Sequence, residues 1–174
     1  SADKSIEIQT VNLNKIKNRE AERLYKIMSD YDLTDRSIFS VWSETTVRYS
    51  DLDPNSHVNN GAISAYFEDG RVRLRTEHLA TPENPMLAGF AIAQVTIKFR
   101  VPLTFPNTVD IGSSIIHIGR TSYILGQSVF VGDRCIATAE VVTVHIDPSS
   151  HKSKPLEGDV KAVLRTVAPL QPNL

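Results

Sequence analysis

The sequence predicts an α+β fold in which an antiparallel sheet of five strands wraps around one long helix. Three observations lead to this prediction. Residues 61–80 repeat apolar side chains with helical spacing. One β-rich segment precedes this stretch and four follow it, and the last three are joined by connections short enough for hairpins. A sheet wrapped about the helix is the compact way to bury its apolar stripe.

Residues 1–40 differ in character from the rest and are expected to form an extension to a main domain of residues 41–174. The segment NREAERLYKIMSDY in this extension carries one apolar stripe at helical spacing, formed by Ala21, Leu24, Tyr25 and Met28. We therefore expect a short amphipathic helix that packs on another surface. Such an extension could cover a substrate mouth, enlarge a subunit interface or decorate the surface.

The first strand and the long helix are predicted next to each other along the chain. Residues 41–50, VWSETTVRYS, are rich in β-branched and aromatic residues and are predicted as a strand. Gly70 on the helical stripe costs about 1 kcal/mol of helix propensity, so we expect it to let the sheet approach closely. The two prolines of TPENP end the helix. The helical stripe consists of Ile63, Tyr66, Phe67, Gly70 and Leu74.

Four strands are predicted after the helix, over residues 90–102, 108–118, 121–130 and 134–146, and a short terminal helix over 155–167. Alternation in the first of these strands places five apolar residues on one face: Ala91, Ala93, Val95, Ile97 and Phe99. A sheet with one helix leaves an edge or a face uncovered. Self-association is therefore expected.

Composition disfavours several classes of function. The 19 Lys and Arg residues balance 20 Asp and Glu residues, with no basic run interleaved with aromatics, so nucleic acid is not the expected partner. No stretch of about 18 apolar residues and no export signal occurs, and the single Cys135 fits a reducing compartment. We expect a soluble, cytoplasmic protein. The five histidines are too scattered to form a metal-ligand motif, so no metal is expected.

The segment DLDPNSHVNN, residues 51–60, has two interpretations. Asp53-Pro54-Asn55 is a common turn sequence, and Asn59 or Asn60 could cap the helix that follows. The same ten residues also bring a carboxylate, an imidazole and amide side chains to one place, as an active site would. The fragment alone favours the turn, and the longer pattern around it favours the site.

The longer stretch YSDLDPNSHVNNGAISAYFEDGRV resembles the signature of the hotdog-fold acyl-CoA thioesterases, in the hydroxybenzoyl-CoA thioesterase-like branch. In that signature an aspartate is followed four residues later by HVNN and then by a helix that contains YFE and an arginine. The matching residues are Asp53, His57–Asn60, Tyr66–Glu68 and Arg71. The resemblance continues through VTIKFRVPL, IGRTSYIL and VHIDP and covers about residues 44–165. Two departures are Ser56, where glycine is usual, and Ile63, where an aromatic residue is common.

The resemblance implies hydrolysis of an acyl-CoA to the free acid and coenzyme A. Asp53 is then the general base or the nucleophile, because a carboxylate is ionised at neutral pH and suits either role. Asn60 is assigned to orienting the carbonyl or the attacking water. His57 is assigned either a direct chemical role or a hydrogen bond that supports the loop. No cofactor is expected, because coenzyme A is part of the substrate.

The resemblance also suggests how the substrate binds. Because the phosphates of coenzyme A are anionic, cationic side chains are expected at the mouth of the site. The predicted substrate-binding residues are Asn59, Lys98, Arg100, Arg120 and Ser122. Asp51 is predicted as a turn residue, and Glu68 with Arg71 as an ion pair one helical turn apart.

A homodimer is expected, with sheets joined edge to edge, Asp53 near the seam and residues from both chains around each site. A dimer of such dimers is a further expectation from the resemblance. The alternative to an enzyme is a non-catalytic hotdog domain that binds acyl thioesters or a protein partner without turnover. Its support is the departure at Ser56 together with the extension of residues 1–40.

Overall fold

The computed structural model describes residues 31–83 and 88–170 of the 174-residue chain, and the described residues from Leu33 onward form one compact unit. The helix predicted within NREAERLYKIMSDY lies outside the described residues, apart from its last position. It therefore stays a prediction, as does the role of the extension. The compact unit begins eight residues before the domain boundary expected at residue 41.

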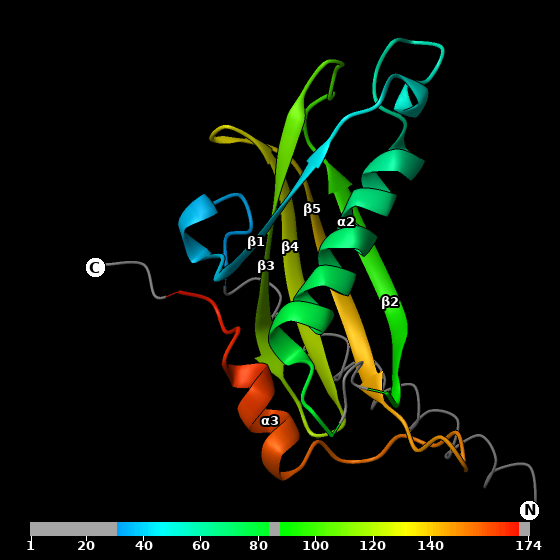
Figure 1. The fold of residues 1–174 in the computed structure, drawn as a ribbon, viewed down its shortest axis with the longest axis vertical. Helices are drawn as coiled ribbons and strands as arrows, with labels where there is room; N and C mark the ends of the chain where they lie inside the picture. The colour runs from blue at the N-terminus through cyan, green and yellow to red at the C-terminus, as the bar shows by residue number, and fades with distance from the viewer. Residues whose placement is uncertain (1–30, 84–87, 171–174) are drawn as a thin grey trace, which may run out of the picture. The chain divides into compact units, whose positions relative to one another are not determined.

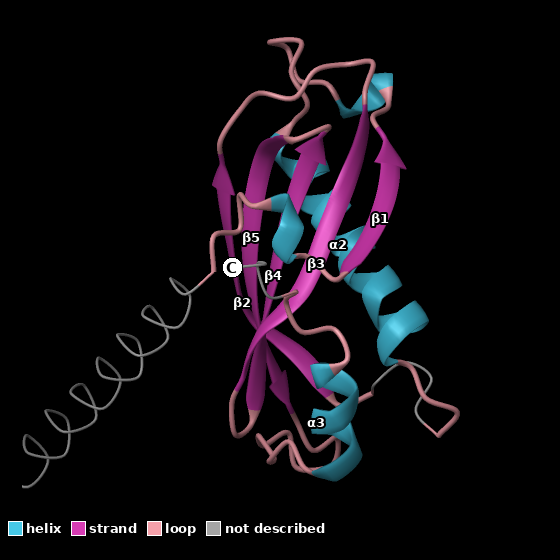
Figure 2. Cartoon of the chain, turned by 90° about the vertical axis from the view of Figure 1, so that its left-hand side faces the viewer, coloured by secondary structure: helices cyan, strands magenta, loops and turns pink. Residues whose placement is uncertain are grey.

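The unit is built on a five-stranded antiparallel sheet with strand order β1-β3-β4-β5-β2 (Figure 1). The strands are β1 (Val41–Thr46), β2 (Phe90–Phe99), β3 (Thr108–Ile118), β4 (Ser122–Val131) and β5 (Arg134–His145). The long helix α2 (Asn60–Leu74) runs along one face of the sheet and continues into a π-helical turn, Arg75–Leu79 (Figure 1, Figure 2). A short helix, α3 (Gly158–Arg165), follows the last strand. The α+β fold expected from the sequence is confirmed.

The apolar stripe of α2 faces the sheet as its spacing predicted. All five stripe residues are buried, and Phe67 is fully buried at the centre of the cluster that α2 makes with β3, β4 and β5. At Gly70 the helix lies close to the sheet. A β-carbon added there would lie 2.7 Å from Cγ2 of Ile111 and 3.1 Å from Nε2 of Gln127. Gly70 therefore sets the spacing of the two layers.

Gly70→Ala is expected to destabilise the fold by about 1–2 kcal/mol, although alanine is the better helix former. The added methyl overpacks the contact with β3, which costs more than the roughly 1 kcal/mol gained in propensity. Urea denaturation measures the change. In an Ile111→Ala background the same substitution should cost less, because the methyl then fills vacated space. An equal cost in both backgrounds would refute the steric explanation.

Strand β2 departs from the alternation read in the sequence. A β-bulge between Ile92 and Gln94 shifts its register against β5. On the N-terminal side of the bulge, Ile92 lies opposite Thr143 and lines the α2 side of the sheet with Phe90. The expectation that Ala91 and Ala93 share a face with Val95 is therefore wrong. A bulge is not visible in a period-two pattern. The apolar residues Ile92, Val95 and Phe99 are 51%, 43% and 46% exposed along this edge strand.

Residues 33–40 pack on the other face of the sheet, over β3 and β4. Phe39 packs over Gly112 of β3 and Leu33 over Gly126 of β4, where an added β-carbon would lie within 2.6 Å and 2.8 Å of those side chains. Arg36 lies 4.3 Å from the ring centroid of Trp42. The two glycines make room for the segment, which thereby becomes part of the compact unit.

Candidate active site

A surface pocket of about 250 Å³ lies where the loop before α2, the first turn of α2 and the residues after β2 meet. It brings together all three side chains predicted as catalytic, and one of the predicted cations. The residues that line it are Asp53, His57, Val58, Asn60, Ile63, Phe99, Arg100, Val101, Pro102 and Leu103. The sequence placed the loop and helix residues at a site, whereas the contribution of the segment after β2 needs the tertiary fold.

The Asp53 side chain both holds the loop and faces the pocket. Its Oδ1 accepts hydrogen bonds from the backbone N–H groups of Asn55 (2.8 Å) and His57 (3.2 Å). The backbone N–H of Asp53 donates to the carbonyl of His57 at 2.8 Å. These bonds form the turn that the sequence predicted. Within the described part of the chain Oδ2 has no hydrogen-bond donor, so one carboxylate oxygen is left for chemistry.

His57 contributes its backbone to this loop, and its exposed ring lines the pocket. In the described residues the ring makes no hydrogen bond to Asp53. The two roles considered for the His57 ring therefore both stay predictions.

Ser56 has the left-handed backbone conformation, with φ of 60°. Glycine adopts this conformation without strain, which explains why the resembling family usually has glycine here. The serine accommodates the angle and the loop closes with a hydrogen bond from its N–H to the Asp53 carbonyl at 3.0 Å. The departure therefore leaves the turn intact.

Ser56→Gly is expected to stabilise the protein by a few tenths to about 1 kcal/mol, because the strain removed exceeds the entropy that glycine adds to the unfolded chain. Ser56→Val is expected to destabilise it, since a β-branched residue fits a positive φ poorly. Thermal denaturation of both variants measures the difference. The matched control is His151→Gly, because His151 also has a positive φ, of 54°, and lies in another exposed loop. A loss of stability in Ser56→Gly would contradict this account.

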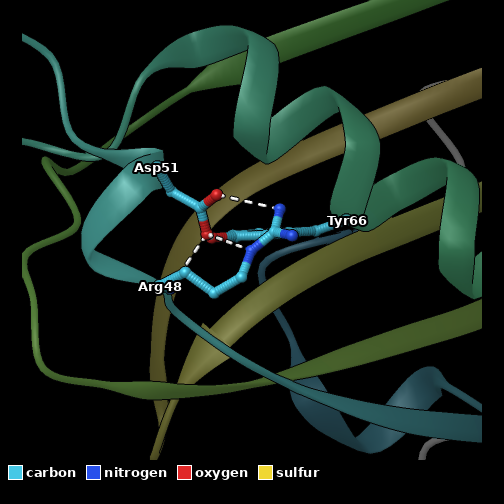
Figure 3. A network of polar contacts seen from close by, with 3 residues as sticks. All are labelled: Arg48, Asp51 and Tyr66. Carbon is cyan, nitrogen blue, oxygen red and sulfur yellow. Dashed lines mark hydrogen bonds and ion pairs between the residues drawn. The ribbon is translucent and has the colours of Figure 1, made fainter.

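Beneath the loop, the buried Asp51 is the centre of a polar network that joins the Tyr66 hydroxyl to the exposed Arg48 (Figure 3). Its carboxylate is 6% exposed and accepts a hydrogen bond from the Tyr66 hydroxyl at 2.5 Å. Arg48 donates to it from its backbone N–H at 2.9 Å and from Nη2 at 3.0 Å. The backbone carbonyl of Asp51 also accepts the N–H of Asn59 at 2.8 Å. Asp51 thus joins the end of the β1 segment to the start of α2 across the base of the loop.

The network fixes the protonation states of its members. Burial alone raises the pKa of the Asp51 carboxyl, but the hydrogen bonds from Tyr66 and Arg48 outweigh it and hold that pKa below its usual value. Burial and the hydrogen bond to Asp51 raise the pKa of Tyr66. Asp51 ends a 3-10 turn, Tyr49–Asp51, but its burial was not predicted. Tyr66 on the apolar stripe was the available signal, because a buried phenol needs a hydrogen-bond partner.

Asn59, rather than Asn60, caps α2. Its Oδ1 accepts the backbone N–H of Gly61 at 2.7 Å, and Asn60 is left at the pocket as the first residue of the helix. The first N–H groups of a helix carry partial positive charge and favour anions. The first turn of α2 therefore gives the pocket that Asp53 lines an electropositive border.

Two of the predicted substrate-binding residues lie far from this pocket within one chain. The loop before α2 is next to the start of β3, because the N–H of Val47 donates to the carbonyl of Asn107 at 2.9 Å. Arg120 and Ser122 lie at the turn after the other end of β3, and its 11 residues span about 33 Å. Lys98 alternates with Ile97 and Phe99 on β2 and so is on the opposite face from α2. Arg100 alone among these cations lines the pocket.

The predicted ion pair between Glu68 and Arg71 does not form. Arg71 donates from Nη1 to Oε1 of Gln127 at 3.3 Å instead, and Glu68 makes no ion pair within 4.0 Å among the described residues. Residues 31–83 and 88–170 contain no group of three His, Cys, Asp or Glu side chains that could hold a metal ion. None of their helices is long and apolar enough to cross a bilayer.

Comparison with known proteins identifies the fold. The model of the thioesterase-like superfamily matches residues 47–164, about two thirds of the chain. The chain belongs to the thioesterase-like superfamily. The matched residues include the loop, α2 and every strand of the sheet except β1.

Solved structures of thioesterases share this hotdog fold. A thioesterase from Thermus thermophilus, in complex with coenzyme A and zinc, is 25% identical with a TM-score of 0.65, and the match covers 74% of this chain and 93% of that one. The probable thioesterase YbaW from Escherichia coli is 25% identical with a TM-score of 0.64, over 73% and 98% of the two chains. A DHNA-CoA thioesterase from Staphylococcus aureus, 14% identical with a TM-score of 0.62, covers 72% and 88% and shows the fold alone. No curated protein sequence matches this chain.

Proposed function

We propose that the protein hydrolyses the thioester of an acyl-CoA, with Asp53 as general base or nucleophile. The observation that carries the proposal is the Asp53 carboxylate, which lines the pocket at the N-terminus of α2 with one oxygen outside the hydrogen bonds of its turn. Membership of the thioesterase-like superfamily and the coenzyme A complex of the Thermus thermophilus protein support it.

The pocket provides the groups that thioester hydrolysis needs. Asp53 either takes a proton from a water that attacks the carbonyl carbon, or attacks that carbon itself to form an anhydride that water then cleaves. Both routes expel the coenzyme A thiolate. In the first route the thiolate takes the proton that Asp53 accepted from the water, and in the second it takes a proton from the water that cleaves the anhydride. The developing negative charge on the carbonyl oxygen is stabilised by the first turn of α2 and by Asn60. One such donor contributes about 3–4 kcal/mol in acyl-transfer enzymes.

The experiment that tests this function is incubation of the purified protein with acyl-CoAs of varied chain length while free thiol is followed. The wild type is expected to release thiol well above the level of Asp53→Ala. Equal, background release by both proteins would defeat the proposal. Recovery of bound but unchanged acyl-CoA would favour the alternative, a non-catalytic hotdog domain.

We further propose a homodimer in which each site takes cations from the second copy. Among the described strands β2 is an edge strand, and it exposes Ile92, Val95 and Phe99. Antiparallel pairing of two β2 edges about a twofold axis would place Phe99 of one copy near Phe90 of the other. Phe90 pairs with His145, and the backbone N–H of His145 donates to the carbonyl of Thr121, so the Arg120 turn lies near Phe90 in each copy. In this dimer the Arg120 turn of one copy therefore approaches the Asp53 loop of the other.

Mixing of two inactive variants tests this arrangement. Asp53→Ala and Arg120→Ala are each expected to lose thioesterase activity. Co-expressed chains should regain about a quarter of it by random pairing, because one site of each mixed dimer has both residues intact. Mass measurement in solution provides the control for association. A monomer of 19.3 kDa, or no regained activity in proven mixed dimers, would contradict the shared site.

A further inference from the structure

A second, more enclosed cavity lies between α2 and the sheet, at the opposite end of α2 from Asp53. Its volume is about 100 Å³. Apolar walls are provided by Leu74, Phe90 and Leu125, and charged side chains by Glu68, Arg71 and Arg75. The cavity therefore combines an apolar lining with charged side chains at its rim, of which Arg71 also lines the neighbouring groove.

Arg71 is a charged side chain with a single neutral hydrogen-bond partner among the described residues. It is half-buried, and within the described part of the chain its guanidinium makes one hydrogen bond, to Gln127 at 3.3 Å, and no ion pair within 4.0 Å. Gln127 is fully buried, and its amide nitrogen donates to the Phe67 carbonyl and to Ser113 Oγ, which keeps its oxygen turned to Arg71.

The surroundings of Arg71 are those of a binding site for an anion. Burial lowers the pKa of Arg71, and the nearby Glu68 only partly opposes this. A guanidinium removed from water without a carboxylate partner is costly, and its planar fork of N–H donors matches a carboxylate. The cavity therefore fits a ligand with an anionic group at one end.

Three neighbouring hollows follow one another along α2, from the Asp53 pocket to the cavity. A groove between α2 and β2, which run along each other in Figure 1, shares Phe99 with the Asp53 pocket and shares Glu68 and Arg71 with the cavity. Its walls are small on the helix, at Gly61 and Ala65, and apolar on the strand, at Val95 and Ile97. From Asn60 to Arg71 the helix rises about 16 Å. A polymethylene chain fits this lining and this length.

We propose that the groove holds the acyl chain of the substrate and that Arg71 binds a carboxylate at its far end, so that the preferred substrates are acyl-CoAs with a terminal carboxylate. This inference rests on the proposed function and names its substrate class. It predicts selectivity by the end group as well as by chain length, because the anion reaches Arg71 only when the chain spans the groove.

The test compares dodecanoyl-CoA with the mono-CoA thioester of dodecanedioic acid. Wild-type kcat/KM is expected to be about 10- to 100-fold higher for the dicarboxylic substrate, as a charge-assisted hydrogen bond would give. Arg71→Met is expected to bring the ratio of the two values close to one. Arg71→Gln, which keeps a donor toward Gln127, is the second variant if Arg71→Met does not fold. Arg73→Met is the matched control, since Arg73 pairs with Asp69 on an exposed part of the same helix and should leave the ratio unchanged.

Calorimetric titration of dodecanedioic acid into Asp53→Asn separates this inference from the proposed function. Binding that is lost in the Asp53→Asn, Arg71→Met double variant supports the anion site even where no acyl-CoA is turned over. Equal wild-type kcat/KM for the two substrates would overturn the inference and leave the thioesterase proposal standing. Dissociation of the dimer by Arg71→Met with an unchanged ratio would also overturn it, because Arg71 would then pair with a second copy.

Discussion

Asp53→Asn is expected to lower kcat for acyl-CoA hydrolysis by about 10²- to 10⁴-fold, the contribution of a positioned general base, and by more if Asp53 is the nucleophile. Asparagine keeps the Oδ1 acceptor for the N–H groups of Asn55 and His57, so the turn should persist. The expected change in KM is small, because the carboxylate acts on the reacting carbon rather than on the coenzyme. Steady-state thiol release measures both parameters.

Asp147 provides the matched control for this substitution. Its Oδ1 accepts the backbone N–H groups of Ser149 (3.0 Å) and Ser150 (2.8 Å), so it holds a turn much as Asp53 does, but it does not line the pocket. Asp147→Asn should therefore leave kcat unchanged. If Asp53→Asn retains most of the wild-type kcat, the catalytic role of Asp53 is wrong, whatever the fold.

Asp51→Ala is expected to destabilise the fold by about 2–3 kcal/mol, because it leaves the buried Tyr66 hydroxyl without its acceptor. Tyr66→Phe should cost less, about 1 kcal/mol, since Asp51 then keeps the N–H groups of Arg48. Asp51→Ala should also lower kcat/KM by roughly tenfold or more, because the base of the Asp53 loop shifts. Urea denaturation and thiol release on the same preparations measure the two effects.

The contribution of Asp51 to stability depends on pH with a defined sign. The folded-state pKa of Asp51 is lower than its unfolded value, so folding favours the ionised carboxyl. The stabilisation is therefore fully present above the unfolded pKa of about 3.9 and is lost as pH falls through the folded value. The gap in unfolding free energy between wild type and Asp51→Asn should narrow as the pH is lowered through this range. A gap that widens there would contradict the account of the network.

The sequence was sufficient for features that depend on local periodicity. The predicted strand at 108–118 matches β3, and the stripe from Ile63 to Leu74 is the buried face of α2. Gly70 was predicted to allow close approach of the sheet, and the 2.7 Å that would separate an added β-carbon from Cγ2 of Ile111 confirms this reason. These features follow from side-chain spacing along one element, which the sequence displays directly.

Other features depend on contacts between distant segments and could not be predicted. The bulge at Ile92 changes which residues of β2 face α2, and nothing in the alternation marks it. Leu33 and Phe39 were assigned to the extension, but they pack on the glycines of β3 and β4. The burial of Asp51 depends on Tyr66, 15 residues away on the helix.

The candidate site likewise contains residues that the sequence placed correctly and residues that only the tertiary fold places. Asp53, His57 and Asn60 are close in sequence, and the loop brings them to one pocket as predicted. Arg100 joins them only because the segment after β2 passes the same loop. Arg120 was assigned to the same mouth by resemblance, but it lies at the other end of β3, so the proposed role of Arg120 requires a second copy of the chain.

The most direct test of the central claim is a crystal structure of Asp53→Asn with a bound acyl-CoA. The account predicts that the thioester carbonyl carbon lies in the pocket between residue 53 and the first turn of α2, about 3–3.5 Å from the side chain that replaces the Asp53 carboxylate. A thioester bound outside that pocket, with its carbonyl out of reach of residue 53 in both copies of the chain, would contradict it.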